Sequence, residues 1–254
     1  MPFSAVVVAK NEAQNIEACL KPLLRIADEV LVADSGSHDE TPAIAQKLGA
    51  RVIHLKWEGY AQTKNRANQQ AKHDWILSID ADEVLSEELE KNLQSLKPRE
   101  HTVYALDRIT NYCGQWVKHS GWYPDWKLRL FNRAHSHWEG AFVHERLHLP
   151  KGTKTERLKG KLFHYSYRTE EEHLQRIEKY AHLSALQMLE EGRKTSLFKL
   201  YCGPTARFLR TFVLKRGFLD GKLGLKLSRR DAFLVKRKEQ WLRQLQEDRK
   251  KTSS

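Results

Sequence analysis

The sequence predicts an α/β fold, in which a mostly parallel sheet flanked by helices is followed by a basic, helical C-terminal extension. Three observations support this prediction. Short apolar runs alternate with amphipathic segments through about the first 80 residues, polar residues follow several of those runs, and the excess positive charge lies after residue 150. A chain of 254 residues is long enough for one large domain with a full core, or for one domain with an extension.

The first part of the chain alternates four predicted strands with three predicted helices. Apolar runs rich in β-branched residues predict the strands, and apolar residues spaced three or four apart predict the helices. In chain order, beginning with a strand, the elements are Phe3–Ala9, Ala13–Leu24, Glu29–Ala33, Thr41–Leu48, Arg51–Leu55, Ala61–Ala71 and Trp75–Ile79. Right-handed crossovers turn this order into a Rossmann-like, mostly parallel sheet with helices on both faces.

Beyond about residue 100 the alternation ends. From about Thr169 the pattern predicts helix, with one break at Cys202-Gly203-Pro204 and another around Gly217–Gly224. We therefore expect a domain over residues 1–168 and a helical segment over residues 169–254. The second segment is also the basic one: residues 1–150 carry 18 Lys and Arg against 20 Asp and Glu, whereas residues 151–254 carry 26 against 12. Such a segment is suited to an anionic partner.

The cysteines and the N-terminus indicate the compartment. Cys19, Cys113 and Cys202 lie far apart without CxxC spacing, which predicts neither a disulfide framework nor a zinc site. The N-terminus lacks a basic start and a small-residue cleavage site, and no run approaches the roughly 18 apolar residues of a membrane span. We expect a cytoplasmic protein that is soluble or attached to a membrane at its surface.

Polar residues follow three of the predicted strands. They begin at Lys10 after the first strand, at Asp34 after the second and at Asp80 after the fourth. Ligands of parallel α/β sheets bind in the crevice beyond the carboxyl ends of the strands. We therefore expect the binding site at this edge.

The stretch Asp80-Ala81-Asp82 places two carboxylates two residues apart. In an extended chain both point to the same side, where they form an oxygen-ligand site for Mg²⁺ or Mn²⁺ that substrate phosphates complete. The alternative is a solvated strand end, or an acidic N-terminus for a helix starting at Ser86. The position of the pair beside two other polar strand ends favours the metal site.

These residues together carry a resemblance to a known family. The stretches VVVAKNEAQNI, VLVADSGSHDET, QTKNRA and WILSIDADE resemble, in this order and over about residues 3–90, family 2 glycosyltransferases of the GT-A fold. The downstream stretches GWYPD, RLF and VHE are similar to lipopolysaccharide-core β-glucosyltransferases. The resemblance implies that residues 1–98 bind a nucleotide-sugar and residues 99–168 bind the acceptor.

The resemblance also implies roles for individual residues. Asp82 would be the direct ligand of Mg²⁺ or Mn²⁺, with His164 as a further ligand or diphosphate contact, and Asp80 would contact the ribose or the water shell of the metal. The implied nucleotide-sugar contacts are Asn11, Glu12, Asp34, Gln62, Lys64, Arg66, Asp80 and Ala81. Some of these polar residues also have a structural interpretation. Asp39 could only cap the helix that begins near Thr41, and Lys64 and Arg66 could only form a solvated helix face.

Transfer with inversion requires a general base that deprotonates the acceptor hydroxyl. The resemblance places Glu145 in this role, with Asp125 and Glu139 as competing candidates and a surface pair of Glu145 with Arg146 as the structural alternative. Aromatic residues crowd the same region and suit sugar C–H groups. The implied acceptor contacts are Trp122, Tyr123, Arg129 and His144.

The basic segment has three interpretations. Leu197–Tyr201 and Arg207–Arg216 interleave apolar and cationic residues, as does an amphipathic helix on an anionic membrane. The second interpretation is nucleic-acid binding, which no motif in the sequence supports. The third is that the segment packs on the first domain or forms a dimer.

The sequence therefore predicts a metal-dependent inverting glycosyltransferase on the inner face of the plasma membrane. It would move a sugar, glucose by resemblance, from a nucleotide-diphospho-sugar, with UDP favoured, to a glycolipid such as the lipopolysaccharide inner core. The alternatives are another lipid-linked or cell-envelope acceptor, or a catalytically inert basic protein on the same fold that binds lipid or nucleic acid.

Overall fold

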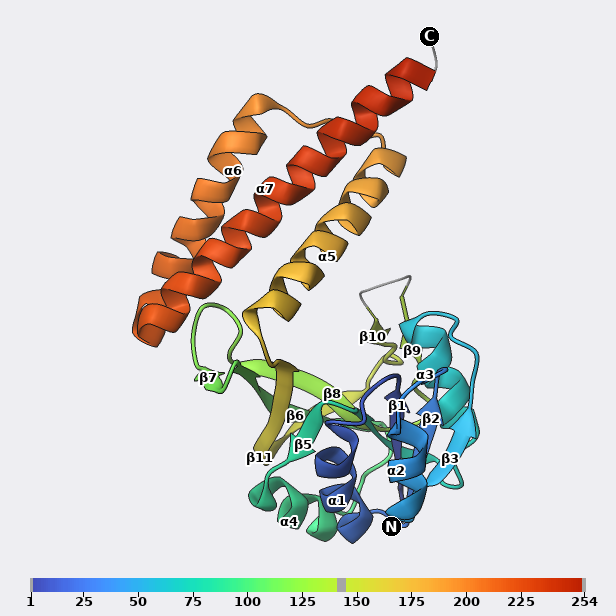
Figure 1. The fold of residues 1–254 in the computed structure, drawn as a ribbon. Coiled ribbons are helices and arrows are strands. Elements are labelled where there is room, and N and C mark those ends of the chain that lie inside the picture. Colours follow the sequence, from blue (N-terminus) through green and yellow to red (C-terminus); the bar gives the residue numbers. More distant parts are fainter. Residues whose placement is uncertain (1, 141–144, 253–254) are drawn as a thin grey trace. The chain divides into compact units, whose positions relative to one another are not determined.

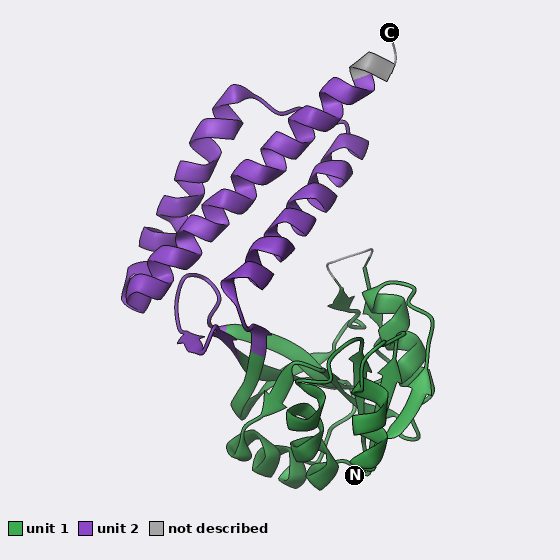
Figure 2. Ribbon diagram, viewed as in Figure 1, with its two compact units in different colours: residues 1–108, 125–164 green, residues 109–124, 165–254 purple. Residues whose placement is uncertain are grey.

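The computed structural model describes residues 2–140 and 145–252. It divides into two compact units (Figure 2). Unit 1 comprises residues 1–108 and 125–164, and unit 2 comprises residues 109–124 and 165–254. The segment 109–124, which the sequence assigned to the acceptor part of the first domain, thus groups with the helical C-terminal residues.

Unit 1 is built on a mixed sheet with strand order β3-β2-β1-β4-β8-β6-β11-β5, to which β7 adds beside β6 in unit 2 (Figure 1). Strands β1 to β4 are parallel, whereas β8 pairs antiparallel with β4 and β6, and β11 pairs antiparallel with β5. A separate two-stranded sheet pairs β9 with β10. The strands are β1 Ser4–Ala9, β2 Glu29–Asp34, β3 Arg51–His54, β4 Trp75–Asp80, β5 Glu83–Leu85, β6 Thr102–Tyr112, β7 Gln115–Val117, β8 Asp125–Asn132, β9 Trp138–Glu139, β10 Arg146–Leu147 and β11 Lys154–Tyr167.

Helices cover both faces of the parallel strands. Alternate residues of β1 point to opposite sides: Ala5 and Val7 pack in the cluster with α1, α2 and α4, while Val6 packs in the cluster with α3. A strand buried on both faces must be apolar at every position, which explains the continuous runs in the sequence. The helices are α1 Ile16–Ile26, α2 Thr41–Lys47, α3 Tyr60–Gln69 and α4 Glu87–Ser95.

Unit 2 is mainly helical. It contains α5 Glu170–Glu190, α6 Leu197–Leu209, a π-helical turn Arg210–Leu214, a 3₁₀ turn Gly217–Asp220 and α7 Gly221–Thr252. No helix among the residues described is both long enough and apolar enough to cross a bilayer.

The predicted strands and helices of the first 80 residues are confirmed to within a few residues at their ends. The predicted break around Gly217–Gly224 is also confirmed, since Arg216 adopts a left-handed φ of 54° before the 3₁₀ turn. The predicted break at Cys202-Gly203-Pro204 is wrong, because α6 continues through Pro204. Gly203 lies against α7, where an added Cβ would meet Val235 Cγ1 at 3.4 Å, an ordinary packing distance, so this part of α6 is supported by tertiary packing.

Candidate functional site

The candidate site lies at the carboxyl ends of β1, β2 and β4. The parallel registers pair Ala9 with Asp34 and Val8 with Asp80, so both aspartates come to the same edge of the sheet. This is the edge at which parallel α/β sheets bind ligands. The predicted grouping of polar strand ends is therefore present in the structure.

The loops after β1 and β2 are joined by hydrogen bonds. Asn11, at φ 56°, donates its backbone N–H to Ser37 Oγ at 2.9 Å, and its side-chain oxygen accepts from the backbone N–H of His38 at 2.9 Å. The backbone N–H of Glu12 donates to Thr41 Oγ1 at 2.8 Å. Asn tolerates the left-handed region better than most residues, which fits it to this position. Asn11 and Glu12 are thereby held beside the end of β2.

Asp39 fixes the start of α2 in the same loop pair. Its carboxylate accepts from the backbone N–H of Thr41 at 3.1 Å and from that of Ala13, across the loops, at 3.1 Å. The N-cap of α2 is Glu40, whose side chain makes no capping bond, so Asp39 supports the first residue of the helix from the position before the cap.

Asp34 is buried at the end of β2 and holds a tight turn. Its carboxylate accepts hydrogen bonds from the backbone N–H groups of Gly36 and Ser37, each at 3.3 Å, and lies 3.2 Å from His54 Nδ1. Burial alone would raise the pKa of Asp34, but the bonds from Ser37, His54 and Gly36 outweigh it and lower that pKa below its ordinary value. Asp34 is therefore ionised at neutral pH.

Asp80 ends β4 between two cations. Its Oδ1 lies 2.9 Å from Lys64 Nζ, and its Oδ2 lies 2.5 Å from Arg129 Nη2. Burial of Asp80 works against ionisation, but Arg129 and Lys64 together hold its pKa well below the usual range. Because both carboxylate oxygens are engaged, Asp80 fits a contact to the ribose or to metal-bound water better than direct ligation.

A chain of buried and partly buried ion pairs extends from Asp80 through Glu83. Glu83 Oε1 lies 2.6 Å from Arg129 Nη2 and 3.1 Å from Arg108 Nη1, and its Oε2 accepts from the backbone N–H of Asp80 at 3.0 Å. Arg108 Nη2 continues to Asp125 Oδ2 at 2.7 Å. The side chain of Glu83 is fully buried, so this network fixes the turn that follows β4.

Asp82 and His164 lie together beside this network. His164 Nε2 is 3.2 Å from Asp82 Oδ2, and the antiparallel pairing of β11 with β5 sets His164 opposite Glu83, the residue after Asp82. Ligands at about 2.1 Å on adjacent corners of an octahedron are about 3 Å apart, so one cation could bind both atoms with little movement. A carboxylate oxygen suits Mg²⁺ or Mn²⁺, and the imidazole nitrogen favours Mn²⁺ of the two. The residues therefore fit the divalent cation that the family implies.

Lys64 connects Asp80 to the base candidate Glu145. Its ammonium group lies 3.1 Å from Glu145 Oε1 and 4.9 Å from the ring centroid of Trp138. The pair between Glu145 and Lys64 replaces the Arg146 pair that the sequence offered as an alternative. A buried cation between two carboxylates is a suitable neighbour for a phosphate that displaces one of them.

The other two base candidates are engaged differently. Asp125 is bound by Arg108 at 2.7 Å and by Lys127 at 3.0 Å. Burial alone would raise the pKa of Asp125, but Arg108 and Lys127 outweigh burial and lower that pKa below its ordinary value. The lowered pKa weakens Asp125 as a proton acceptor. Glu139 lies 3.1 Å from His148 Nδ1 and 3.4 Å from His137 Nε2.

The remaining predicted contacts divide between surface and interior. Of the three predicted contacts on α3, Gln62 and Arg66 are exposed and Arg66 pairs with Glu58 at 2.6 Å, whereas Lys64 is buried on the opposite face. Ala81 is buried in the core. Arg129 is buried as well, committed to Asp80 and Glu83 through Nη2, and its Nε has no hydrogen-bond partner among the described residues.

Of the predicted acceptor contacts, Arg129 lies at this site, bound to Asp80 and Glu83. Trp122 and Tyr123 belong to unit 2, where Trp122 packs at 6.1 Å from the Tyr112 ring and 6.0 Å from the Tyr167 ring. His144 lies outside the described residues.

Two residues of the site have no counterpart among the predicted contacts. Glu83 completes the acidic stretch after β4, and its place immediately after Asp82 was the only signal for it in the sequence. Arg108 lies in β6, a strand in the region where the predicted alternation ended, so no signal singled it out. Both were found only through the ion-pair network.

Comparisons with known proteins agree with this architecture. Residues 4–156 match the family model "Glycosyl transferase family 2". An uncharacterized glycosyltransferase of Rickettsia typhi is 30% identical over 231 residues, which are 86% of this chain and 79% of the relative. The lipopolysaccharide core biosynthesis glycosyltransferase LpsC of Rhizobium meliloti is 30% identical over 226 residues, which are 84% of this chain and 81% of the relative.

Solved structures resemble the chain more distantly. TarS of S. aureus aligns with 90% of this chain and 47% of its own at a TM-score of 0.46 and 17% identity. Glucosyl-3-phosphoglycerate synthase from Mycobacterium tuberculosis, solved with Mn²⁺ and UDP, aligns with 43% of this chain and 44% of its own at a TM-score of 0.36 and 24% identity. The family match covers more than half of the chain, and the relatives span most of it. The protein belongs to glycosyl transferase family 2 and has the GT-A type of α/β fold.

Proposed function

We propose that the protein is a metal-dependent, inverting hexosyltransferase that uses a nucleotide-diphospho-sugar. The observation that carries this proposal is the contact of Asp82 with His164 at the carboxyl edge of the sheet, beside the ionised Asp80. These two side chains would hold Mg²⁺ or Mn²⁺, which when bound neutralises charge on the departing diphosphate.

The rest of the edge would bind the nucleotide. Asp34 ends β2, and Asn11 and Glu12 lie on the loop after β1. Hydrogen bonds hold all three in place, so they can accept bonds from a base or ribose without reordering. Lys64, held between two carboxylates, can donate to a phosphate oxygen. Gln62 and Arg66, exposed on the other face of α3, contribute less to this arrangement.

Glu145 is the general base in this proposal. The general base must be free to take the proton of the sugar acceptor's hydroxyl group. Among the described residues, Glu145 makes a single ion pair, to Lys64. Asp125, in contrast, is bound by two cations and has a lowered pKa. Glu145 would take the proton as the hydroxyl oxygen attacks the anomeric carbon on the face opposite the leaving diphosphate.

The acceptor class rests on the resemblance of the downstream motifs and on the relative LpsC. Both support a glycolipid of the lipopolysaccharide core as acceptor. The inner core, glucose as the transferred sugar and UDP as the nucleotide are proposed from the resemblance of the motifs alone. Another lipid-linked acceptor is the alternative: a dolichyl-phosphate hexose transferase of Haloferax volcanii is 34% identical, but over only 42% of this chain.

A membrane-borne acceptor agrees with the surface of unit 2. Large apolar side chains are exposed from α6 to the 3₁₀ turn, with Phe198 74% and Leu214 78% exposed. Leu197, Tyr201 and Leu209 are spaced by multiples of four residues, which sets them on one face of α6. The exposed cations Lys199, Arg210 and Arg216 lie in the same stretch. We call this stretch, residues 197–219, the apolar-basic surface, and we propose that it binds an anionic membrane.

A donor screen tests the proposed activity. Hydrolysis and transfer are measured with UDP-, GDP-, ADP- and CMP-sugars, with and without Mn²⁺, and the anomeric configuration of the product is determined by NMR. The proposal predicts turnover of a UDP-hexose that requires the metal, with inversion. Turnover that persists in chelator, or retention of configuration, contradicts it.

A further inference from the structure

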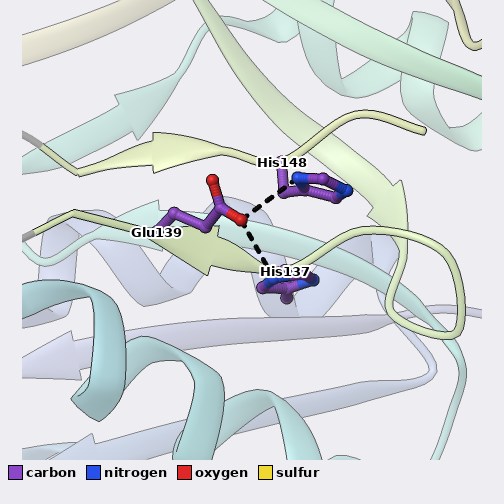
Figure 3. A group of neighbouring side chains, drawn as sticks. All are labelled: His137, Glu139 and His148. Carbon is purple, nitrogen blue, oxygen red and sulfur yellow. Dashed lines mark ion pairs between the residues drawn. The ribbon is translucent and has the colours of Figure 1, made fainter. Parts of the chain in front are cut away.

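We propose that His137, Glu139 and His148 form a second metal site, for a transition-metal ion of the zinc class. The nitrogen and oxygen atoms of the three side chains lie within 4.8 Å of one another (Figure 3). Glu139 Oε1 is 3.1 Å from His148 Nδ1 and 3.4 Å from His137 Nε2, and the two imidazole rings stack with centroids 4.8 Å apart. This proposal concerns residues outside the Asp82 and His164 pair and does not depend on the transferase activity.

The pairing of β9 with β10 builds this site. Trp138 pairs with Leu147 and Glu139 with Arg146, and the backbone N–H of His148 donates to the carbonyl of His137 at 2.8 Å, which extends the ladder by one pair. Side chains alternate across a strand, so His137 and Glu139 share one face while Trp138 takes the other. Trp138 and Leu147 are buried in the core, which fixes the register and leaves the three ligands on the outer face.

The ligand set selects the class of metal. Two imidazoles and one carboxylate are the ligands of open zinc sites, in which water or another ligand takes the fourth position. Ligands at about 2.1 Å in a tetrahedron are about 3.4 Å apart, close to the separations of Glu139 from both histidines. Imidazole-rich sites favour Zn²⁺, Ni²⁺ or Co²⁺ over Mg²⁺, so this site differs in selectivity from Asp82 and His164.

One cation lies near the site. Arg146 Nε is 3.9 Å from Glu139 Oε2, the carboxylate oxygen that does not contact the histidines. The Arg146 side chain is 83% exposed, so solvent screens this pair and it competes weakly with a divalent ion for Glu139. Oε1 remains directed at both imidazoles.

The position of the site suggests what an ion would do. It would cross-link β9 and β10 next to Trp138, whose backbone exchanges two hydrogen bonds with the Asn65 side chain of α3, each of 2.8 Å. Lys64, the neighbour of Asn65, contacts both Trp138 and Glu145. An ion at this site would therefore brace the strand pair that supports Lys64.

Cobalt titration tests the site directly. Co²⁺ is added to the full chain in the Asp82→Ala background, which removes the first site, and binding is followed by the visible absorption of four-coordinate Co²⁺ and by displacement with Zn²⁺. We expect one equivalent of Co²⁺ to bind. The double variant His137→Ala/His148→Ala is expected to lower the affinity for Co²⁺ by more than about 100-fold. Loss of a residue that only hydrogen-bonds to a metal ligand already lowers metal affinity by about 10- to 100-fold.

The matched control is a second histidine pair in unit 1. The rings of His101 and His135 lie 5.2 Å apart and both residues are exposed. His101→Ala/His135→Ala is expected to bind Co²⁺ as the parent does, and circular dichroism checks that all variants are folded. Absence of a four-coordinate spectrum in the parent, or equal loss in both double variants, overturns the proposal. Because the readout is spectroscopic, inactivity of the enzyme in the donor screen leaves this result unaffected.

Discussion

Lys64 forms ion pairs with two carboxylates of the candidate site, because its ammonium group contacts both Asp80 and Glu145. This arrangement suggests that a diphosphate oxygen and the general base compete for one cation. When the donor binds, Lys64 can turn to the phosphate, which leaves Glu145 free to accept a proton. The base and the donor site are thus coupled through one side chain.

The role of Glu145 predicts the behaviour of its amide variant. Glu145→Gln is expected to lower kcat by about 10²–10⁴-fold, because the amide keeps the shape but cannot take the proton. Donor affinity, measured by calorimetry with the nucleotide-sugar, should not fall, and it should rise to the extent that Glu145 competes with the diphosphate for Lys64. Asp125→Asn serves as the comparison: it should lower the unfolding temperature by weakening the Arg108 contact while retaining far more activity. If Asp125→Asn lost activity and Glu145→Gln did not, the base would be Asp125.

His173 is a residue for which the structure predicts a pH dependence of stability. Burial first, and then the nearby Arg230 and Arg176, lower its pKa to about 4 against a small opposite effect of Glu170, and its Nδ1 lies 3.1 Å from the Tyr112 hydroxyl. The folded state favours the neutral ring, so the contribution of His173 is complete above pH 6.5 and is lost as the pH falls towards 4. The full loss is up to about 3 kcal/mol at 1.36 kcal/mol per pKa unit.

Proton NMR of the His173 ring measures this pKa directly. We expect a titration midpoint near 4 in the folded chain, and urea unfolding at pH 7 and pH 5 should show a smaller pH effect in His173→Gln than in the wild type. A midpoint near 6.5 would show that His173 is solvated and would contradict the packing described for it.

The sequence could predict the charged residues that follow strands, but not their partners. Asp34, Asp80 and Asp82 could be located because parallel topology brings strand ends together, and His164 was proposed from the family resemblance. The contact of Arg129 with Asp80 depends on the pairing of β4 with β8, which joins residues about 50 positions apart. Long-range antiparallel registers of this kind leave no local signal.

At the scale of elements, Gly160 sets how closely β11 approaches α4. A Cβ at Gly160 would lie 2.3 Å from the backbone nitrogen of Leu89, and its φ is +96°. Gly160→Ala is therefore expected to destabilise the protein by about 1–3 kcal/mol beyond the cost of the left-handed conformation.

Gly152→Ala is the matched control for that prediction. Gly152 has a similar φ of +84° with no atom within 4 Å of an added Cβ, so it carries the conformational cost without the clash. The difference in the free energy of unfolding between the two variants, from urea titrations, isolates the steric effect. Equal values would contradict the close packing of β11 on α4.

The elements of the first 80 residues could be predicted because each one is local and periodic. The antiparallel strands β6, β8 and β11 escaped prediction because they mix buried and polar positions, as the charged residues Arg108, Asp125 and Arg129 show. The continuation of α6 through Pro204 escaped it for a different reason, since packing against α7 outweighs the local preference of proline.

For the whole molecule, we expect attachment to anionic membranes through the apolar-basic surface. Lys199→Glu/Arg210→Glu/Arg216→Glu should reduce co-sedimentation with vesicles that contain anionic lipid and reduce transfer to a membrane-borne acceptor. Hydrolysis of the soluble donor should be unchanged. Binding of the wild type should weaken with salt without vanishing, because apolar insertion is not screened.

A control variant carries the same change of charge elsewhere in unit 2. Arg229, Lys236 and Arg243 are exposed on α7, and their reversal to Glu should leave vesicle binding much closer to that of the wild type. Equal loss in both variants would mean that only net charge matters. Equal pelleting of the wild type and the first variant would instead favour packing or dimerisation through residues 197–219.

Electron paramagnetic resonance of Mn²⁺ in the presence of UDP tests the proposed metal site at Asp82 and His164 most directly. We expect the wild type to bind one Mn²⁺ whose affinity rises with UDP. Asp82→Asn should abolish this UDP-dependent binding, and His164→Ala should weaken it. All three proteins should keep the same circular dichroism spectrum. UDP-dependent Mn²⁺ binding that survives in Asp82→Asn would contradict the placement of the metal, and with it the proposed mechanism.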